Sequence, residues 1–320
     1  MERRAKFMCL SRRQVRSATA ECGLPGHIDN VEPMEGGRAN TLYRLRREDG
    51  REFVLRLYTR DSASCLKEAA LARKLARSVP MPALEVVHAG PLPRIGVPGA
   101  VFALVEGDRL DRVLAGGNAS TTLARAIGRV MAAIAAVEFP RRGDLVADED
   151  SLAVRPWIFG GKSFNWSCME DTPAGARLGP ELSRRLLEFE ARCEKRWPET
   201  ADARHVHGDF NPTNILVRGE EVAAVLDWEF AHAGDPLMDF GNILRRRDTT
   251  PLPEWFPEAL AEGFLGGGGA LPADWRARAE YLDLSSACEF LSSVEDRPQL
   301  HAAAQRQVRD TLALWNDQPA

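Results

Sequence analysis

Alternating apolar and polar positions in the first third of the chain predict a small antiparallel sheet. In a strand predicted at 51–58, every second residue is apolar and Arg56 lies on the opposite face. A strand at 40–47 leads into it through Asp49-Gly50, a dipeptide typical of hairpin turns. The other elements predicted in this region are an N-terminal helix from Ser11, strands at 31–35, 84–88 and 100–106, and a helix from about 61 to 77.

The rest of the chain is predicted to be mainly helical. Residues 140–180 contain several prolines and glycines and are expected to be irregular. Helices are predicted at 120–139, 181–197, 254–264, 273–294 and 299–316. The pattern therefore indicates an α+β fold, with a small antiparallel-sheet lobe carrying one long helix over residues 1–107 and a larger, mainly helical lobe over 108–320.

One short hairpin carries polar residues at its open end. Two apolar strands flank a turn that contains glycine, with Asn214 entering the hairpin and Asp227 leaving it. Cross-strand neighbours lie about 5–8 Å apart, so an amide oxygen and a carboxylate are expected to converge there. Such oxygen ligands suit Mg²⁺, and Asp209 supplies a further carboxylate nearby. The arrangement predicts a site for phosphoryl transfer.

The residues around this hairpin resemble those of a known family. His207-Gly-Asp209 is followed by Asn214, by Leu226-Asp-Trp-Glu229 and by Gly234-Asp-Pro-Leu-Met-Asp239. This order is similar to that of the aminoglycoside phosphotransferase and choline-kinase-like family, tightly over 205–242 and more loosely over 31–107. The resemblance implies a two-lobed protein-kinase-like fold. It also implies Mg²⁺-dependent transfer of a phosphoryl group from ATP or GTP to a hydroxyl of an antibiotic or a metabolite.

The resemblance also implies a role for each residue of the motif. Asp209 would be the catalytic base or would orient the acceptor hydroxyl, and Asn214 and Asp227 would hold Mg²⁺. His207 would brace the catalytic loop. Asp239 would bond the backbone of that loop from a following helix.

The N-terminal lobe is expected to grip the nucleotide. Glu68 lies on the apolar stripe of its helix, and a buried carboxylate needs a partner. Arg56 is the candidate, at the position of the kinase lysine, and would also bind the donor phosphates. The other residues expected to bind the nucleotide belong to a glycine-containing turn and to the hinge between the lobes: Gly36, Gly37, Arg38, Asn40, Leu104 and Glu106.

Two alternatives remain open at this point. The sequence His205-Val-His207-Gly-Asp209 has the ligand types of a zinc hydrolase. Arg56 and the reduced glycine turn are also compatible with a nucleotide-binding pseudokinase or scaffold. A protein kinase is disfavoured by Gly208 and by the Trp-Glu pair that follows Asp227.

Composition limits the classes of partner but says little about the reaction. The chain has 320 residues and a net charge of -4, which argues against nucleic acid as a partner. Its six cysteines are scattered, and no signal peptide or membrane span is apparent, which favours reduced thiols in a cytoplasmic protein. A monomer or homodimer is expected. The acceptor class stays open, because the acidic residues expected near the acceptor alternate with basic ones: Asp148, Glu149, Asp150, Glu170 and Asp171.

Overall fold

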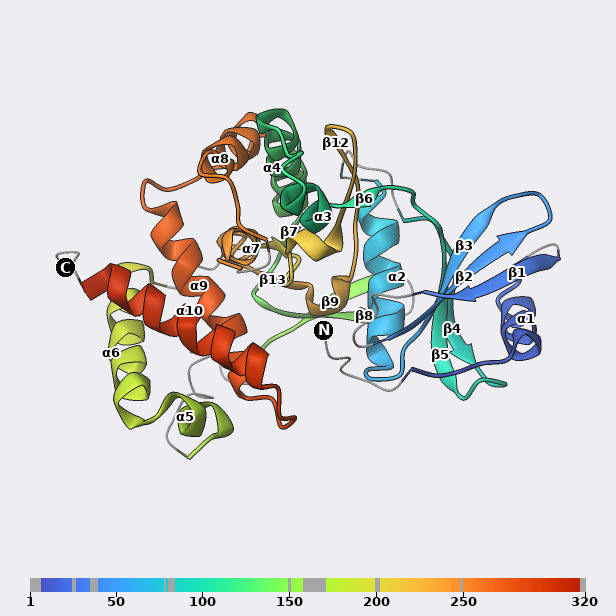
Figure 1. Cartoon of the computed structure of the whole chain (residues 1–320), viewed down its shortest axis with the longest axis horizontal. Helices are drawn as coiled ribbons and strands as arrows, with labels where there is room; N and C mark the ends of the chain where they lie inside the picture. The colour runs from blue at the N-terminus through green and yellow to red at the C-terminus, as the bar shows by residue number, and fades with distance from the viewer. Residues whose placement is uncertain are drawn as a thin grey trace.

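A computed structural model describes residues 7–24, 27–34, 40–77, 79, 84–148, 151–157, 171–198, 202–247 and 250–316. The N-terminal lobe is a five-stranded antiparallel sheet in the order β1-β2-β3-β5-β4, with α1 packed against it (Figure 1). All five predicted strands are present, with shifted ends. Their bounds are Ile28–Pro33, Thr41–Arg47, Glu52–Leu57, Val86–Leu92 and Val97–Ala103 for β1 to β5. The capping box predicted at Ser11 is also present and begins α1, Arg12–Glu21.

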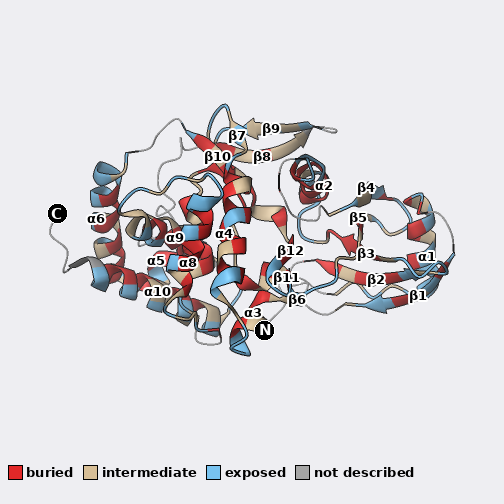
Figure 2. Cartoon of the chain, turned by 90° about the horizontal axis from the view of Figure 1, so that it is seen from above, coloured by how far each residue is buried: buried red, intermediate tan, exposed pale blue. Residues whose placement is uncertain are grey.

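Helix α2, Ala63–Leu75, packs against both lobes. Figure 2 shows it between the N-terminal sheet and strands β8 and β9 of the C-terminal lobe. Its residues Leu71 and Leu75 belong to the main apolar core of the C-terminal lobe, whereas Cys65 contacts a smaller cluster under the sheet. Lys67 adds a polar contact, because its Nζ donates to the backbone carbonyl of Glu229 at 2.7 Å. The helix is therefore fixed to the C-terminal lobe by both apolar and polar contacts.

The C-terminal lobe is built around helices, as predicted. Helix α4 is shorter than expected: Ser120 caps it, it ends at Ala135, and the two residues at 138–139 form strand β7. The short helices α3 and α5 were not predicted. The helices of this lobe are α3 Leu110–Ala115, α4 Thr121–Ala135, α5 Pro173–Leu178, α6 Pro180–Arg196, α7 Leu237–Leu244, α8 Phe256–Gly266, α9 Trp275–Leu291 and α10 Pro298–Asn316.

Two small sheets complete this lobe. One has the order β7-β10-β13-β8-β9 and the other β12-β11-β6. The expectation that 140–180 is irregular is wrong for its described part, because β8 and β9 form a hairpin there and α5 follows. The bounds are β6 Asp108–Arg109, β7 Glu138–Phe139, β8 Gly143–Asp148, β9 Ser151–Arg155, β10 Ala203–Val206, β11 Ile215–Arg218, β12 Glu221–Val225 and β13 His232–Gly234.

Helices α4 and α8 approach each other through glycine. A Cβ atom on Gly128 would lie 2.1 Å from the backbone oxygen of Leu260, and one on Gly263 would lie 2.1 Å from that of Arg125. The two backbones are therefore closer than any side chain would allow. This contact fixes the outer layer of the C-terminal lobe (Figure 1).

The observed architecture is the predicted one: a sheet-rich lobe followed by a larger helical lobe. Across the described ranges, none of the helices has both the length and the apolar character needed to cross a bilayer.

Candidate active site

The predicted catalytic loop joins β10 to β11, and helix α7 holds its backbone. The Asp239 carboxylate accepts hydrogen bonds from the backbone N–H of His207 at 2.8 Å and of Gly208 at 2.9 Å. Asn242, further along α7, accepts from the N–H of Phe210 at 3.1 Å. Burial raises the pKa of Asp239 to about 7, and the two N–H donors oppose this shift. The predicted contact of Asp239 with the loop backbone is confirmed.

The backbone conformation of the loop requires glycine at position 208. Its φ is +80°, in the left-handed region that favours glycine. A Cβ atom there would also lie 2.4 Å from the backbone oxygen of Phe230. The positive φ and this close approach together require glycine at position 208.

The Asp209 carboxylate is oriented by two amides of its own loop. Asn211 Nδ2 donates to Asp209 Oδ1 at 2.7 Å, and Asn214 Nδ2 donates to Oδ2 at 3.0 Å. Burial raises the pKa of Asp209, and these hydrogen bonds oppose the change. The result is a fixed carboxylate at the edge of the cleft, suited to accept a proton from a hydroxyl.

Asn214 and Asp227 meet at the open end of the β11–β12 hairpin, as predicted. Asn214 ends a short 3₁₀ turn, and its backbone carbonyl accepts from the N–H of Leu226 at 2.8 Å. Asp227 follows directly, with a side chain that is 43% exposed. An amide oxygen and a carboxylate are thus brought to one edge of the cleft by the hairpin, and these are ligand types that suit Mg²⁺.

Arg56 connects the two lobes at this point. Its Nη2 lies 3.2 Å from Glu68 Oε1 on α2, so the predicted ion pair is present. Its Nη1 forms a close ion pair with Asp227 of the C-terminal lobe, which the sequence did not predict. With its amide oxygen turned toward Arg56, Asn40 accepts from Nη2 at 2.8 Å. The guanidinium therefore stands beside the residues proposed to hold the metal.

His207 is a positioning residue. Its ring is fully buried, with Nε2 2.9 Å from the carbonyl of Leu226 and Nδ1 3.2 Å from the N–H of Asp209. These contacts require a neutral ring that donates from Nε2, and burial lowers the pKa of His207 to about 4. His207 braces the loop, as predicted.

The zinc alternative is not supported by the geometry. His205 lies in β10, fully buried, and its ring stacks on Trp228 with centroids 5.3 Å apart. Among the described residues, its side chain and those of His207 and Asp209 do not converge as metal ligands. The Asp209 carboxylate instead accepts from two amides.

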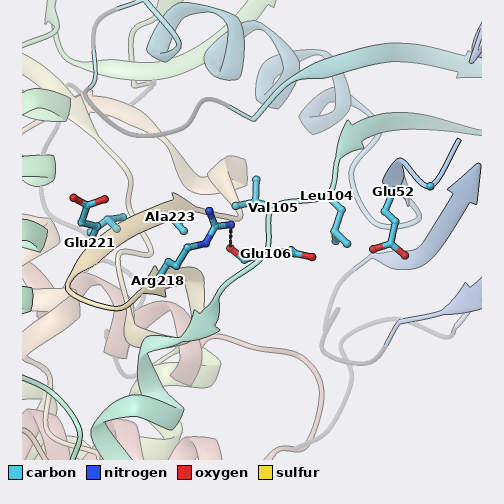
Figure 3. Close-up of a pocket in the computed structure, with 9 residues that line it drawn as sticks. Glu52, Leu104, Val105, Glu106, Arg218, Glu221 and Ala223 are labelled. Atoms are coloured by element: carbon cyan, nitrogen blue, oxygen red, sulfur yellow. Dashed lines mark hydrogen bonds between the residues drawn. The ribbon is translucent and has the colours of Figure 1, made fainter.

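The predicted hinge lies between the cleft and a second, smaller pocket on the surface. Leu104 and Glu106 line both. The smaller pocket has a volume of about 440 Å³, and Arg218 reaches across it from β11 to donate to the backbone carbonyl of Glu106 at 3.0 Å (Figure 3). That carbonyl is therefore engaged. Leu104 donates its N–H to the backbone carbonyl of Glu52 at 2.9 Å, so the predicted hinge continues β5 of the N-terminal sheet along the cleft.

The rest of the predicted nucleotide turn cannot be placed. Gly36, Gly37 and Arg38 lie outside the described residues, while Asn40 lines the cleft.

A cavity of about 2070 Å³ extends from Arg56, the predicted hinge and the β11–β12 hairpin to the end of α7 and to α9 and α10. The part lined by α7, α9 and α10 is the candidate acceptor side. Residues 140–180 were expected to contribute here, but none of those that the structure describes lines the cavity. Asp171 is exposed elsewhere, and the remaining acidic candidates are not described at the level of their side chains.

A buried polar network behind the loop was missed by the sequence analysis. Asp283 of α9 is 2% exposed and accepts from Asn242 Nδ2 at 2.7 Å, from Arg245 Nε at 2.7 Å and from Gln307 Nε2 at 2.6 Å. It therefore ties α7, α9 and α10 together. The sequence offered no local signal for Asp283; on α7, Asn242 follows Asp239 by three residues and so lies on the same face of the helix.

The sequence model of the phosphotransferase enzyme family matches residues 30–281. A homoserine kinase of Methylobacterium nodulans is 27% identical over 217 residues, which cover 64% of this chain and 60% of that protein. The match thus spans less than two thirds of this relative.

Solved structures show the same fold. A macrolide 2′-phosphotransferase from Brachybacterium faecium superposes with a TM-score of 0.65 at 20% identity, over 96% of this chain and 99% of the other. A thermostable variant of an aminoglycoside phosphotransferase, in a ternary complex with AMP-PNP and hygromycin B, gives 0.63 at 18% identity, over 94% and 99%. At these identities the similarity establishes the protein-kinase-like fold of the chain.

Proposed function

Because the chain belongs to the phosphotransferase enzyme family, we propose that it transfers the γ-phosphoryl group of ATP or GTP to a hydroxyl of a small molecule, with Mg²⁺ bound. The observation that carries this proposal is that Asp209, Asn214 and Asp227 all line one cavity with Arg56 and the hinge. A donor held at the hinge and an acceptor held beside α10 would meet at Asp209.

The chemistry assigned to the chain is direct transfer. The acceptor oxygen forms a bond to the γ-phosphorus as the bond from that phosphorus to the β–γ bridging oxygen breaks, and the nucleoside diphosphate leaves. Asp209 orients the hydroxyl and takes its proton. Positioning and charge neutralisation account for catalysis in this class of reaction, without a covalent enzyme intermediate.

The metal fits the residues at the hairpin. The Asn214 amide oxygen and the Asp227 carboxylate are hard oxygen ligands placed by adjacent backbone segments, which is the number of protein ligands that Mg²⁺ usually takes beside phosphates. Mg²⁺, when bound, neutralises charge on the donor phosphates. Arg56 adds a permanent positive charge at the same place, held by Glu68.

The nucleotide donor is supported by the fold and by the hinge. A protein of the same fold binds AMP-PNP, and here the backbone of residues 104–106 offers polar groups at the corresponding cleft. The acceptors named for relatives include an amino acid and antibiotics, so those names do not define one acceptor for this chain.

Nucleotide consumption tests the proposal. ATP or GTP turnover is measured with Mg²⁺ against a panel of hydroxylated antibiotics and metabolites. With an accepted compound, Asp209→Asn should reduce kcat about 100- to 10,000-fold, the range of a general base, while nucleotide binding is retained.

Asp202→Asn is the matched control, because Asp202 is exposed and outside the cavity. Near-normal turnover of Asp209→Asn would refute the role of Asp209. Nucleotide binding without consumption across the panel would favour the pseudokinase alternative.

A further inference from the structure

The acceptor side of the cleft is rich in arginine. Carboxylates that line the same part of the cavity are fewer, namely Glu280, Asp283 and Asp310. The arginines form two groups, one at the end of α7 and one on or beside α9 and α10: Arg245, Arg246, Arg247, Arg276, Arg297 and Arg306.

Two members of the α7 group have internal roles. Arg245 forms an ion pair with Asp283 and is largely buried with it. Arg247 caps the end of α7, because its guanidinium donates to the backbone carbonyls of Arg245 at 2.9 Å and Asn242 at 2.6 Å. Both side chains are thus positioned by the protein itself.

Arg246 has no such role. It is exposed, it lines the cavity, and across the described ranges it forms neither a hydrogen bond nor an ion pair. Helix capping and the Asp283 network explain its neighbours but not Arg246. A guanidinium presented to a cavity is suited to bind a carboxylate or a phosphate.

Arginines on the opposite wall add to the positive electrostatic potential of the cavity. Arg276 is paired with Glu258 and Arg297 with Glu295, but both of these carboxylates lie outside the cavity lining. The cavity surface therefore presents mostly the cationic partner of each pair. An acceptor with several positive charges would be repelled, and an anionic one would be attracted.

The end of α7 lies within electrostatic reach of the proposed catalytic base. Arg246 directly follows Arg245, and the positive charge of Arg245 opposes the burial that raises the pKa of Asp209. Asp209 and Arg246 also line the same cavity, so one acceptor molecule can contact both.

We propose that the acceptor carries an anionic group, a carboxylate or a phosphate, which Arg246 binds while the acceptor hydroxyl lies at Asp209. The inference rests on the proposed function and specifies its substrate class. It separates this chain from an enzyme for polycationic acceptors.

The test uses matched six-carbon alcohols that differ at the far end. They are 6-hydroxyhexanoate and 6-hydroxyhexyl phosphate (anionic), 6-hydroxyhexanamide (neutral) and 6-aminohexan-1-ol (cationic). Binding is measured by calorimetry on the full chain saturated with Mg²⁺ and AMP-PNP. At least one anionic compound should bind about tenfold or more tightly than the amide, as expected for one charge-assisted contact. The tighter of the two identifies a carboxylate or a phosphate site.

Substitutions assign the effect to Arg246. Arg246→Gln should remove most of the preference, and Arg246→Glu should favour the amino alcohol. Arg309→Gln is the matched control, because Arg309 is exposed on α10 but does not line the cavity, and it should keep the preference.

Equal binding of all four compounds, a preference that survives in Arg246→Gln, or no binding of any of them overturns the inference. Failure of the proposed function has a different signature. If the neutral amide or the amino alcohol stimulates nucleotide consumption while the anionic compounds do not, the proposed phosphotransferase activity is kept and only the proposal of an anionic acceptor is rejected. If no acceptor in the wider panel does so, the phosphotransferase itself falls.

Discussion

Asp227 is held in a left-handed backbone conformation, with φ at +63°. Among the described residues it is the only one besides glycines with a positive φ in this range. Such a conformation costs about 1–2 kcal/mol for most residues, and asparagine and aspartate tolerate it best. The fold therefore retains strain at the residue proposed to bind the metal, as is common at functional sites.

Two substitutions of Asp227 distinguish the role of its carboxylate from the role of its backbone conformation. Both Asp227→Asn and Asp227→Ala should lose Mg²⁺-dependent nucleotide affinity, because the carboxylate ligand is gone. Asp227→Ala should also be less stable than Asp227→Asn by about 1 kcal/mol, because alanine adopts the left-handed region less readily. Calorimetric titration with and without Mg²⁺ measures the first effect and urea denaturation the second. Unchanged affinity in both variants would remove Asp227 from the metal site.

His205 makes the fold sensitive to acid. Burial, followed by the neighbouring His207, lowers the pKa of His205 from 6.5 to about 3. Above pH 6.5 both folded and unfolded states are neutral at this residue. As the pH falls below 6.5 the unfolded state binds a proton that the folded state does not, so stability is lost until the folded state is protonated near pH 3.

His205→Leu should remove this loss. Between pH 6.5 and 4.5 the wild type should lose about 2 kcal/mol of unfolding free energy relative to the variant, because the slope rises from half of its full value at pH 6.5 to about 1.4 kcal/mol per pH unit. Denaturant unfolding at several pH values measures the difference. His27→Leu is the control, because it replaces a histidine that is exposed. If the curve for His205→Leu runs parallel to that of the wild type, His205 does not contribute to the loss of stability in acid.

At the scale of elements, the contact between α4 and α8 depends on two glycines. Gly263→Ala would place a methyl group on the backbone of Arg125, so the helices must separate. Overpacking of this kind costs about 1–3 kcal/mol, which outweighs the gain of about 1 kcal/mol in helix propensity.

Gly266→Ala provides the matched control in the same helix. Its Cβ would meet no atom within 4 Å, so this variant should be as stable as the wild type or more stable. Thermal unfolding of both variants makes the comparison. Equal stability of Gly263→Ala and Gly266→Ala would contradict the close contact.

The elements that the sequence predicted well are those with strong local signals. The Asp49-Gly50 turn, the alternation around Arg56 and the capping box at Ser11 are all local, and each appears in the structure. The β8–β9 hairpin in 140–180 was missed because its pairing with β13 depends on residues far away in the chain. The prolines and glycines of 140–180 indicated turns, so the short strands between them were not predicted.

The same distinction applies to the site. Asp209, Asn214, Asp227 and Asp239 were identified through their order in the chain. Asp283 could not be, because it lies on a distant helix and acquires its role only where α9 packs on α7. Local motifs therefore predicted the arrangement around the β11–β12 hairpin better than the part of the cavity lined by α9 and α10.

At the scale of the whole molecule, the lobes share contacts through α2 and Arg56. Leu71 and Leu75 of α2 lie in the core of the C-terminal lobe, and Arg56 joins Glu68 to Asp227. We therefore expect one cooperative unfolding transition rather than two. The boundary between the two lobes at residue 107 stays a prediction.

Bound nucleotide should raise the Tm of this single unfolding transition. A ligand at 100 times its Kd stabilises the folded state by about 2.7 kcal/mol, so saturating AMP-PNP should raise Tm when Mg²⁺ is present. Chelation of Mg²⁺ with EDTA should remove most of the shift. Calorimetric scans with AMP-PNP alone, Mg²⁺ alone and both together make the test. An equal shift with and without Mg²⁺ would show that nucleotide binding does not require the metal.

The C-terminal helix α10 forms one wall of the large cavity while Arg56, the hinge and the hairpin lie elsewhere in it. Substitutions on the exposed face of α10 can thus accumulate without disturbing the parts proposed to handle the donor. Natural variation or laboratory selection could thus reshape the wall proposed to contact the acceptor while Arg246 stays in place. A library confined to residues 298–314 is the economical place to search for new acceptors.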